Sequence, residues 1–351
     1  MKVDELRKTL KNYENDTVIE IAVELYKRVP KRIKEEYGID DGIQNFVSSG
    51  NIKKKQAEPM PFDTLCDEVW DFLVNANADY YFSKRKDRAK WRFKVKEYIK
   101  ALMAVPGENS DTAADLLMKI YRALTYGCGY WIFNTDNTFR SVGYKQTELL
   151  RVVIEKCFYS GIDKDKIRQT IALVLEGYVD RETLPTGLML TLVDCLKSPE
   201  TKEIAILECD EYLKSGIGKI FSKDKLFRIN LSEYRRNDII ENIHELCFHL
   251  RAALFEYDKA VSEYKKNIKV SKEKNKEIGL YCMLRWLEMY DQVDLWIREY
   301  EAAVARRISP RKELEEKYEI LKECKSFEVM WKKLKNSAAI VIKTWELNIS
   351  S

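Results

Sequence analysis

The sequence predicts an all-α protein: a solenoid-like array of helical repeats with two short β-hairpin insertions, followed by an antiparallel bundle of long helices. Charged residues make up 34% of the 351 positions, and glycine and proline are sparse, at 13 and 7. This composition is typical of a helix-rich globular protein. Two patterns refine the prediction. Apolar residues recur at helical spacing through the C-terminal third, and one motif occurs twice in the middle of the chain.

Three apolar seams run through the C-terminal third. They extend from Ile240 to Ile268, from Met283 to Val304 and from Phe327 to Trp345, at alternating steps of three and four. A helix with so narrow an apolar stripe must bury it against another helix. As one helix, the first seam is about 40 Å long at 1.5 Å per residue. Three seams predict an antiparallel bundle, with an intermolecular coiled coil as the alternative, so the pattern does not fix an oligomeric state.

An internal duplication marks the centre of the chain. Residues 124–140 and 213–228 share a leucine, two glycines, an Ile-Phe pair, an aspartate and a Phe-Arg pair. Because glycine favours the left-handed cap of a helix, we expect Gly127 and Gly216 each to end a helix before a hairpin with a polar turn. Each turn carries residues that bind a partner or bridge each other: Asp136, Arg140, Asp224 and Arg228.

Two boundaries divide the sequence into three regions. A polar run and a lysine triplet lead to Pro59-Met60-Pro61, which indicates a linker after the N-terminal helices. The helix that carries the first seam follows the second copy of the duplication. We therefore predict N-terminal helices and a linker over 1–58, a helical-repeat region over 59–230 and a long-helix bundle over 231–351.

A strongly basic helix is expected at residues 84–96, which hold eight lysines and arginines against the single acid Asp87. Its aromatic residues lie at helical spacing and fit the core. The basic face is either a solvated surface or a patch that binds phosphate groups. Four of its residues, at steps of three and four, are the first candidates for a partner surface: Arg85, Arg88, Arg92 and Lys96.

The N-terminal part of the chain resembles a family of small uncharacterised bacterial proteins. The resemblance rests on residues 6–37, on Tyr80-Tyr81-Phe82-Ser83-Lys84 and on Lys90-Trp91-Arg92-Phe93-Lys94-Val95-Lys96. It covers about the first hundred residues and implies a bacterial protein. The family carries no assigned activity, so the resemblance implies no site, cofactor or substrate.

The residues that bear chemistry match no known catalytic or metal motif. The only histidines, His244 and His249, are five residues apart, whereas the zinc-protease motif needs four so that both imidazoles share a helix face. On the seam, His244 falls beside the stripe and His249 at an exposed position. Cys128 lies between two glycines, and a nucleophilic thiol there requires a base within reach. A calcium loop at 134–145 fails because Phe139 stands where glycine is needed.

The charge balance and the cysteine pattern limit which classes of protein the sequence can belong to. The 61 basic and 57 acidic residues nearly balance, so that only a local patch could bind nucleic acid. Eight cysteines without a Cys-x-x-Cys pair are typical of reduced thiols. The chain has no signal-peptide core at its start and no apolar run of membrane length. We therefore expect a cytoplasmic protein that does not enter a membrane.

The leading hypothesis is a non-catalytic intracellular interaction or scaffold protein with a protein partner, because helical arrays offer extended concave surfaces. It predicts no catalytic residue, no metal and no cofactor. The alternative is a nucleic-acid-binding protein that uses the helix at 84–96. A third hypothesis is hydrolase or thiol chemistry near Cys128 or His244.

Overall fold

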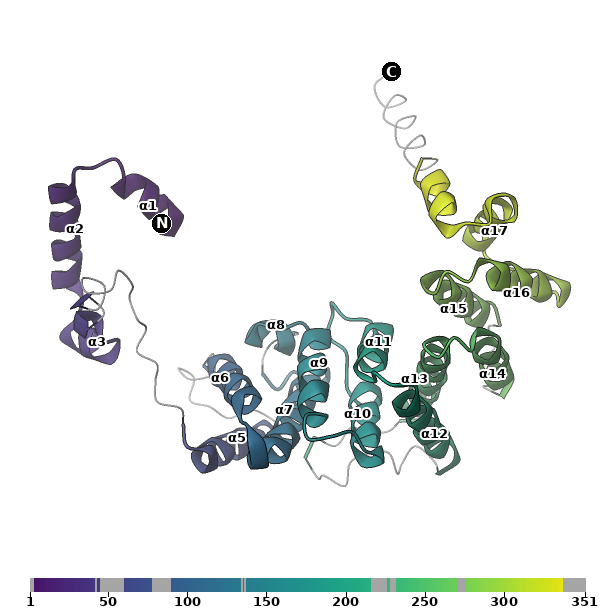
Figure 1. Cartoon of the computed structure of the whole chain (residues 1–351), viewed down its shortest axis with the longest axis horizontal. Coiled ribbons are helices and arrows are strands. Elements are labelled where there is room, and N and C mark those ends of the chain that lie inside the picture. Colours follow the sequence, from purple (N-terminus) through teal and green to yellow (C-terminus); the bar gives the residue numbers. More distant parts are fainter. Residues whose placement is uncertain are drawn as a thin grey trace, which may run out of the picture. The chain divides into compact units, whose positions relative to one another are not determined.

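The structure is a computed structural model that describes residues 3–41, 43–44, 60–77, 90–133, 135, 137–215, 226–227, 232–270 and 276–336. Every regular element in these ranges is a helix, and none of these residues forms a strand (Figure 1). The all-α prediction is confirmed. The chain divides into two compact units, unit 1 (Met1–Pro61) and unit 2 (Phe62–Ser351).

Unit 1 consists of short helices: α1 (Val3–Leu10), α2 (Asn15–Arg28) and α3 (Lys31–Glu36). The Tyr26 hydroxyl donates a hydrogen bond of 2.5 Å to the Asp40 carboxylate, and the Lys34 ammonium lies 3.6 Å from the centroid of the Tyr26 ring. Among the side chains of unit 1 whose exposure is described, none is buried. Unit 1 therefore has no hydrophobic core within the described residues.

Unit 2 holds two hydrophobic cores. The first core takes its buried side chains from α5 to α13, and the second from α13 to the end of the described chain. The helices of the first core are α5 (Phe62–Asn77), α6 (Trp91–Ala104), α7 (Ser110–Tyr130), α8 (Thr138–Val142), α9 (Gln146–Cys157), α10 (Lys164–Glu176), α11 (Pro185–Cys195), α12 (Pro199–Ser215) and α13 (Glu233–Ala252).

The second core is built from helix hairpins. Its helices are α14 (Tyr257–Val270), α15 (Lys276–Met289), α16 (Val293–Ala305) and α17 (Lys312–Cys324), and residues 327–336 are also helical. α13 packs on α14, α15 on α16 and α16 on α17, while α13 also contacts α11 and α12 of the first core (Figure 1). Both predicted region boundaries, 58/59 and 230/231, lie outside the described residues, and the division into three regions stays a prediction.

The expectation of one continuous helix over the first seam is wrong. α13 and α14 are separated by residues 253–256 and fold against each other as a hairpin. In this turn Phe255 adopts a left-handed conformation with φ of 60°, and the Glu256 N–H donates to the Arg251 carbonyl, which closes the helix end. Leu254 and Tyr257 keep the apolar spacing across the turn and pack against the cores, so periodicity alone does not reveal the break.

The second seam breaks in the same way. Asp291 has φ of 55°, and the Gln292 N–H donates to the Leu287 carbonyl between α15 and α16. Lys325, with φ of 45°, ends α17. The turns within the three hairpins, at Phe255, Asp291 and Lys325, are 36 and 34 positions apart, and Arg307, with φ of 62°, lies between the second and the third hairpin. The third seam is helical over residues 327–336, and its remainder lies outside the described residues.

The β-hairpin expected at residues 124–140 is wrong as well. α7 continues to Tyr130, and Trp131, with φ of 57°, takes the left-handed cap. The short helix α8 occupies the place of the second expected strand. The second copy of the motif, 213–228, lies mostly outside the described residues.

The two glycines of the first copy serve close packing instead of capping. A Cβ atom added to Gly127 would lie 2.7 Å from the Phe133 ring, and one added to Gly129 would lie 2.4 Å from the Tyr178 ring. Real Cβ contacts are not this short, so only glycine lets these rings approach the helix. Glycine at these two positions indicates a crowded helix surface and not the helix end that was predicted.

A buried lysine provides a test of the second core. Lys317 on α17 is fully buried and lies 3.0 Å from Glu288 and 2.9 Å from Glu313. Lys317→Ala leaves the buried Glu288 carboxylate unpaired, and we expect it to lower the free energy of unfolding by about 3–5 kcal/mol. Lys332→Ala removes an exposed pair with Glu328 and should cost under about 0.5 kcal/mol. Urea unfolding followed by circular dichroism measures both, and equal losses would contradict the burial.

Candidate functional site

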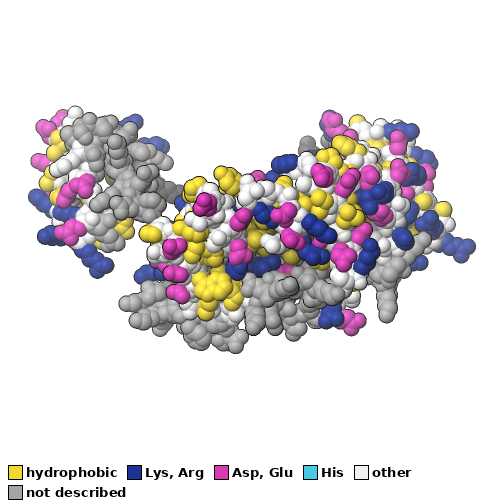
Figure 2. All heavy atoms as spheres, turned by 60° about the horizontal axis from the view of Figure 1, so that its bottom comes forward, with side chains coloured by type: hydrophobic (Ala, Val, Ile, Leu, Met, Phe, Trp, Pro, Cys, Tyr) yellow, Lys and Arg dark blue, Asp and Glu magenta, His cyan; other side chains and the backbone are white. Residues whose placement is uncertain are grey.

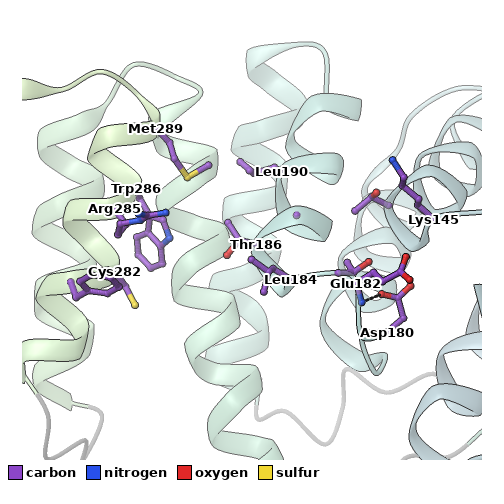
Figure 3. A pocket seen from close by; sticks show the side chains of 14 residues that line it. Lys145, Asp180, Glu182, Leu184, Thr186, Leu190, Cys282, Arg285, Trp286 and Met289 are labelled. Atoms are coloured by element: carbon purple, nitrogen blue, oxygen red, sulfur yellow. Dashed lines mark hydrogen bonds between the residues drawn. The ribbon is translucent and has the colours of Figure 1, made fainter. Parts of the chain in front are cut away.

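A groove with a volume of about 740 Å³ lies where the two cores of unit 2 meet. One wall comes from residues 180–190, at the start of α11, and the other from α15 (Figure 3). The volume falls in the range of known binding pockets. The lining side chains are Lys145, Thr147, Asp180, Glu182, Thr183, Leu184, Thr186, Leu190, Tyr281, Cys282, Arg285, Trp286 and Met289, together with Gly187.

The loop before α11 is held in place by one buried side chain. Gln146, at the start of α9, donates from Nε2 to the Tyr178 carbonyl at 3.0 Å and accepts the Asp180 N–H at 2.8 Å. Asp180 in turn accepts the Glu182 N–H at 2.9 Å. Because Gln146 is fully buried, these bonds exchange with water poorly and fix the loop. The first wall of the groove is therefore rigidly placed.

Leu184 is the most exposed apolar side chain of the groove. It occupies the N-cap position of α11, directly before Pro185, and 74% of its surface is exposed. Serine, threonine, aspartate or asparagine are preferred at this position because their oxygens cap the free N–H groups, and Leu184 offers no such bond. Its side chain therefore contributes neither to the helix cap nor to the core, and it is available at the rim of the groove.

The second wall combines a buried aromatic ring with exposed side chains. Trp286 packs in the second core, with ring centroids 5.0 Å from Phe248 and 4.8 Å from Tyr264, and turns one edge to the groove. One turn along α15, 52% of the Met289 surface is exposed. Arg285 is exposed and forms no ion pair with any described residue. The wall thus offers apolar contact beside an exposed, positively charged side chain.

A polar network joins the groove floor to α13. The Thr186 hydroxyl donates to the Glu245 carboxylate, whose Oε1 lies 3.7 Å from His249 Nε2. On its other side, His249 Nδ1 lies 2.9 Å from the Tyr290 hydroxyl. Burial raises the pKa of Tyr290, so this hydroxyl stays protonated at neutral pH. The network runs from Thr186 on α11, which lines the groove, through α13 to Tyr290, the residue after α15.

The network lacks the hydrogen bonding and the accessibility of a catalytic triad. The His249 imidazole does stand between the Tyr290 hydroxyl and the Glu245 carboxylate, but Nε2 is 3.7 Å from the carboxylate and forms no hydrogen bond with the described residues, and the ring is fully buried. His249 was expected to be exposed and is fully buried, because α13 contacts a core on two faces. His244 lies on another side of the helix, and burial lowers its pKa.

Of the eight residues predicted as a binding surface, three belong to the described residues. Arg140 donates to Glu182 at 2.8 Å and so joins α8 to the loop at the rim of the groove. Arg92 and Lys96 lie on α6, and Lys96 extends towards Gly143 after α8. The other five lie outside the described residues: Arg85, Arg88, Asp136, Asp224 and Arg228.

The other residues considered for catalysis or metal binding, Cys128 and the histidines, make contacts within the helical core. The Cys128 thiol lies 3.2 Å from the Thr138 hydroxyl, which donates to the Leu124 carbonyl. Both histidines of the chain are on α13. Among the described residues no group of three or more histidine, cysteine, aspartate or glutamate side chains could hold a metal ion. In the same part of the chain, no helix has the length and apolar character needed to cross a membrane.

Comparison of the chain with family models, with curated proteins and with solved structures finds no match. The evidence for the candidate site is therefore its geometry alone. No sequence pattern predicted the groove, although Leu184 directly before Pro185, at the start of α11, was a usable signal. The facing residues on α15 gave none, since they lie about a hundred positions away.

The hydrogen bond between His249 and Tyr290 allows a stability test of the groove floor. Tyr290→Phe removes the hydroxyl and leaves the buried His249 Nδ1 without this partner, so we expect a loss of about 1–2 kcal/mol of unfolding free energy. Tyr318→Phe is the matched control, because the Tyr318 hydroxyl donates to the exposed side chain of Glu301. Its loss should stay below about 0.5 kcal/mol by thermal unfolding. A Tyr290→Phe variant as stable as the control would contradict the network.

Proposed function

We propose that the chain is a non-catalytic, helical interaction protein that binds a segment of a partner protein in the groove between α11 and α15. The observation that carries the proposal is the pair of exposed apolar side chains, Leu184 and Met289, on opposite walls. Figure 3 shows Leu184 and Leu190 on one side and Trp286 and Met289 on the other. Removing this surface from water favours binding by roughly 25 cal/mol per Å².

The hairpins of the second core support a repeat array. Their turns recur at intervals of 36 and 34 residues, which matches the length of known two-helix repeats. Each hairpin presents one helix beside its neighbour, and stacked hairpins form extended grooves that suit a polypeptide. In this proposal α13 and α14 form the first hairpin, and the groove lies where this array joins the helices of the first core.

A polypeptide fits the groove better than a small molecule. Small-molecule sites bury most of the surface of the ligand, which requires enclosing walls, whereas Leu184 is largely exposed. The polar groups at the rim are already engaged, since Asp180 holds the loop and Glu182 pairs with Arg140. Arg285 is the exception, and it favours a partner segment with an acidic side chain next to its apolar residues. In this proposal the protein acts in a reducing compartment such as the cytoplasm, which is supported by eight cysteines that form no disulfide.

The groove can be tested without knowing the partner. A random peptide library on phage is panned on the full chain, and fluorescein-labelled copies of enriched peptides are titrated by fluorescence anisotropy. We expect Leu184→Asp and Met289→Glu each to raise the Kd at least about tenfold, because a buried charge opposes apolar contact. Leu207→Asp, at an exposed position on α12, is the matched control and should leave the Kd unchanged. Peptides that bind both groove variants with unchanged affinity would refute the groove as the binding site.

Nucleic-acid binding through α6 is the second candidate, and one observation favours it. Arg92, Lys94, Lys96 and Lys100 form no ion pair with any described residue, and Glu97 is the single acid on this helix. Against this, Figure 2 shows basic and acidic side chains intermingled over the described surface in view, with no continuous basic face there. A local patch on α6 is therefore the form that this function would take.

Salt dependence tests the second candidate. If three phosphate contacts form, the affinity for labelled DNA or RNA should fall about 40-fold between 50 and 200 mM salt. Arg92→Glu with Lys96→Glu should weaken binding further at the lower salt concentration, and Lys312→Glu, an exposed lysine on α17, serves as the control. Anisotropy that shows no binding at 50 mM salt would remove this candidate and leave the groove proposal intact.

A further inference from the structure

The two walls of the groove in unit 2 are stripes of helix surface. Four lining residues of α15 have the i, i+3, i+4 and i+7 spacing of a single helix face: Cys282, Arg285, Trp286 and Met289. This stripe is two turns, or about 10 Å, long. On α11 the lining residues Thr186 and Leu190 lie one turn apart. Figure 3 shows Leu190 and Met289 at the same end of the groove, so the two stripes run side by side along it.

The backbone of these walls is engaged in its own hydrogen bonds. Within α15 the N–H and carbonyl groups bond along the helix. In the loop before α11, the Asp180 N–H is bonded to Gln146 and the Glu182 N–H to the Asp180 side chain. An extended segment gains much of its affinity from main-chain bonds to a sheet edge, and none of the described residues forms a strand. A helix bonds its own main chain internally, so it needs only side-chain contacts with the walls.

The charges that line the groove favour an acidic group on the bound segment. Asp180 is buried, and the Glu182 carboxylate accepts a hydrogen bond from an arginine on α8. The two basic residues of the lining, Lys145 and Arg285, are exposed. Lys145 already lies 3.7 Å from Glu148. Arg285 is therefore the basic group that the α15 wall presents to a carboxylate beside its apolar stripe.

From these observations we infer that the occupant of the groove is an amphipathic helix of the partner protein, packed along α11 and α15. The inference rests on the function proposed above and adds the form and the residue pattern of the bound segment. Apolar side chains one turn apart on this helix contact Leu184 and Leu190 on one wall and Met289 on the other. An acidic side chain at the edge of its apolar stripe pairs with Arg285.

Two phage-displayed libraries, panned on the full chain, test the form of the partner. Both randomise positions spaced i, i+3, i+4 and i+7 in a host of about 15 residues, mostly alanine and glutamine, and the second library also carries a central proline that prevents a helix. We expect only the first library to yield peptides whose Kd rises at least about tenfold with Leu184→Asp and with Met289→Glu. Groove-dependent peptides from the second library alone would overturn the inference and leave the proposed function standing. If neither library yields them, both fail.

Proline substitutions in an enriched peptide test its helical form directly. Proline at a central position outside the apolar stripe should raise the Kd about 100-fold, because it removes a helix hydrogen bond without touching the contact face. Proline at the first helical position should change the Kd less than about twofold, since the N–H of that residue has no partner in a helix. Equal Kd values for the two proline peptides would overturn the helix.

A charge exchange tests the pairing with Arg285. We expect enriched peptides to carry an acidic residue at one fixed position, and Arg285→Glu to raise their Kd about tenfold. Replacing that acidic residue by lysine should restore the affinity for the Arg285→Glu chain and weaken binding to the wild type. Lys312→Glu, at an exposed lysine on α17, is the matched control and should leave the Kd unchanged. An exchange that fails to restore binding would overturn the assignment of Arg285.

Discussion

Unit 2 depends on α13, because this helix contributes buried side chains to both hydrophobic cores. Leu246 and Leu250 belong to the first core and Phe248 to the second. Between these faces, Glu245 and His249 connect to the helices on either side, α11 and α15. The separation of the two groove walls is therefore set by one helix. A change that moves α13 would alter the two cores and the groove together.

The helix class followed from composition and apolar spacing, whereas the breaks between helices did not. Phe255 adopts the left-handed conformation at a turn although phenylalanine rarely does so, and Gly127 and Gly129 lie inside a helix. At the two glycines, contacts with distant residues decide which residue type fits. The rings that press on the glycines come from segments that the local sequence does not specify.

Sequence patterns could not predict the groove for a related reason. Its walls come from Leu184 and Met289, which only the fold brings together. The seam placed His249 on an exposed face, since one apolar stripe was taken as the whole buried surface of α13. A helix that buries two faces needs apolar residues on both. The second set on α13, which includes Phe248 and Ala252, was not part of the predicted seam. The basic helix was visible in the sequence because its residues are contiguous.

Two apolar side chains stand where local structure alone would disfavour them. Leu184 fills an N-cap without capping, and Phe255 holds a left-handed turn at a cost of roughly 1–2 kcal/mol. Phe255 is 82% exposed, and its ring contact within the described residues is with Tyr257, at 6.3 Å between centroids. Natural sequences break local rules mainly where function requires it. Both positions are helix ends near α13, and Tyr257 contacts the ring of Tyr290, the neighbour of Met289 in the groove wall. Local helix-end preferences therefore do not account for the exposed apolar side chains at these two positions of unit 2.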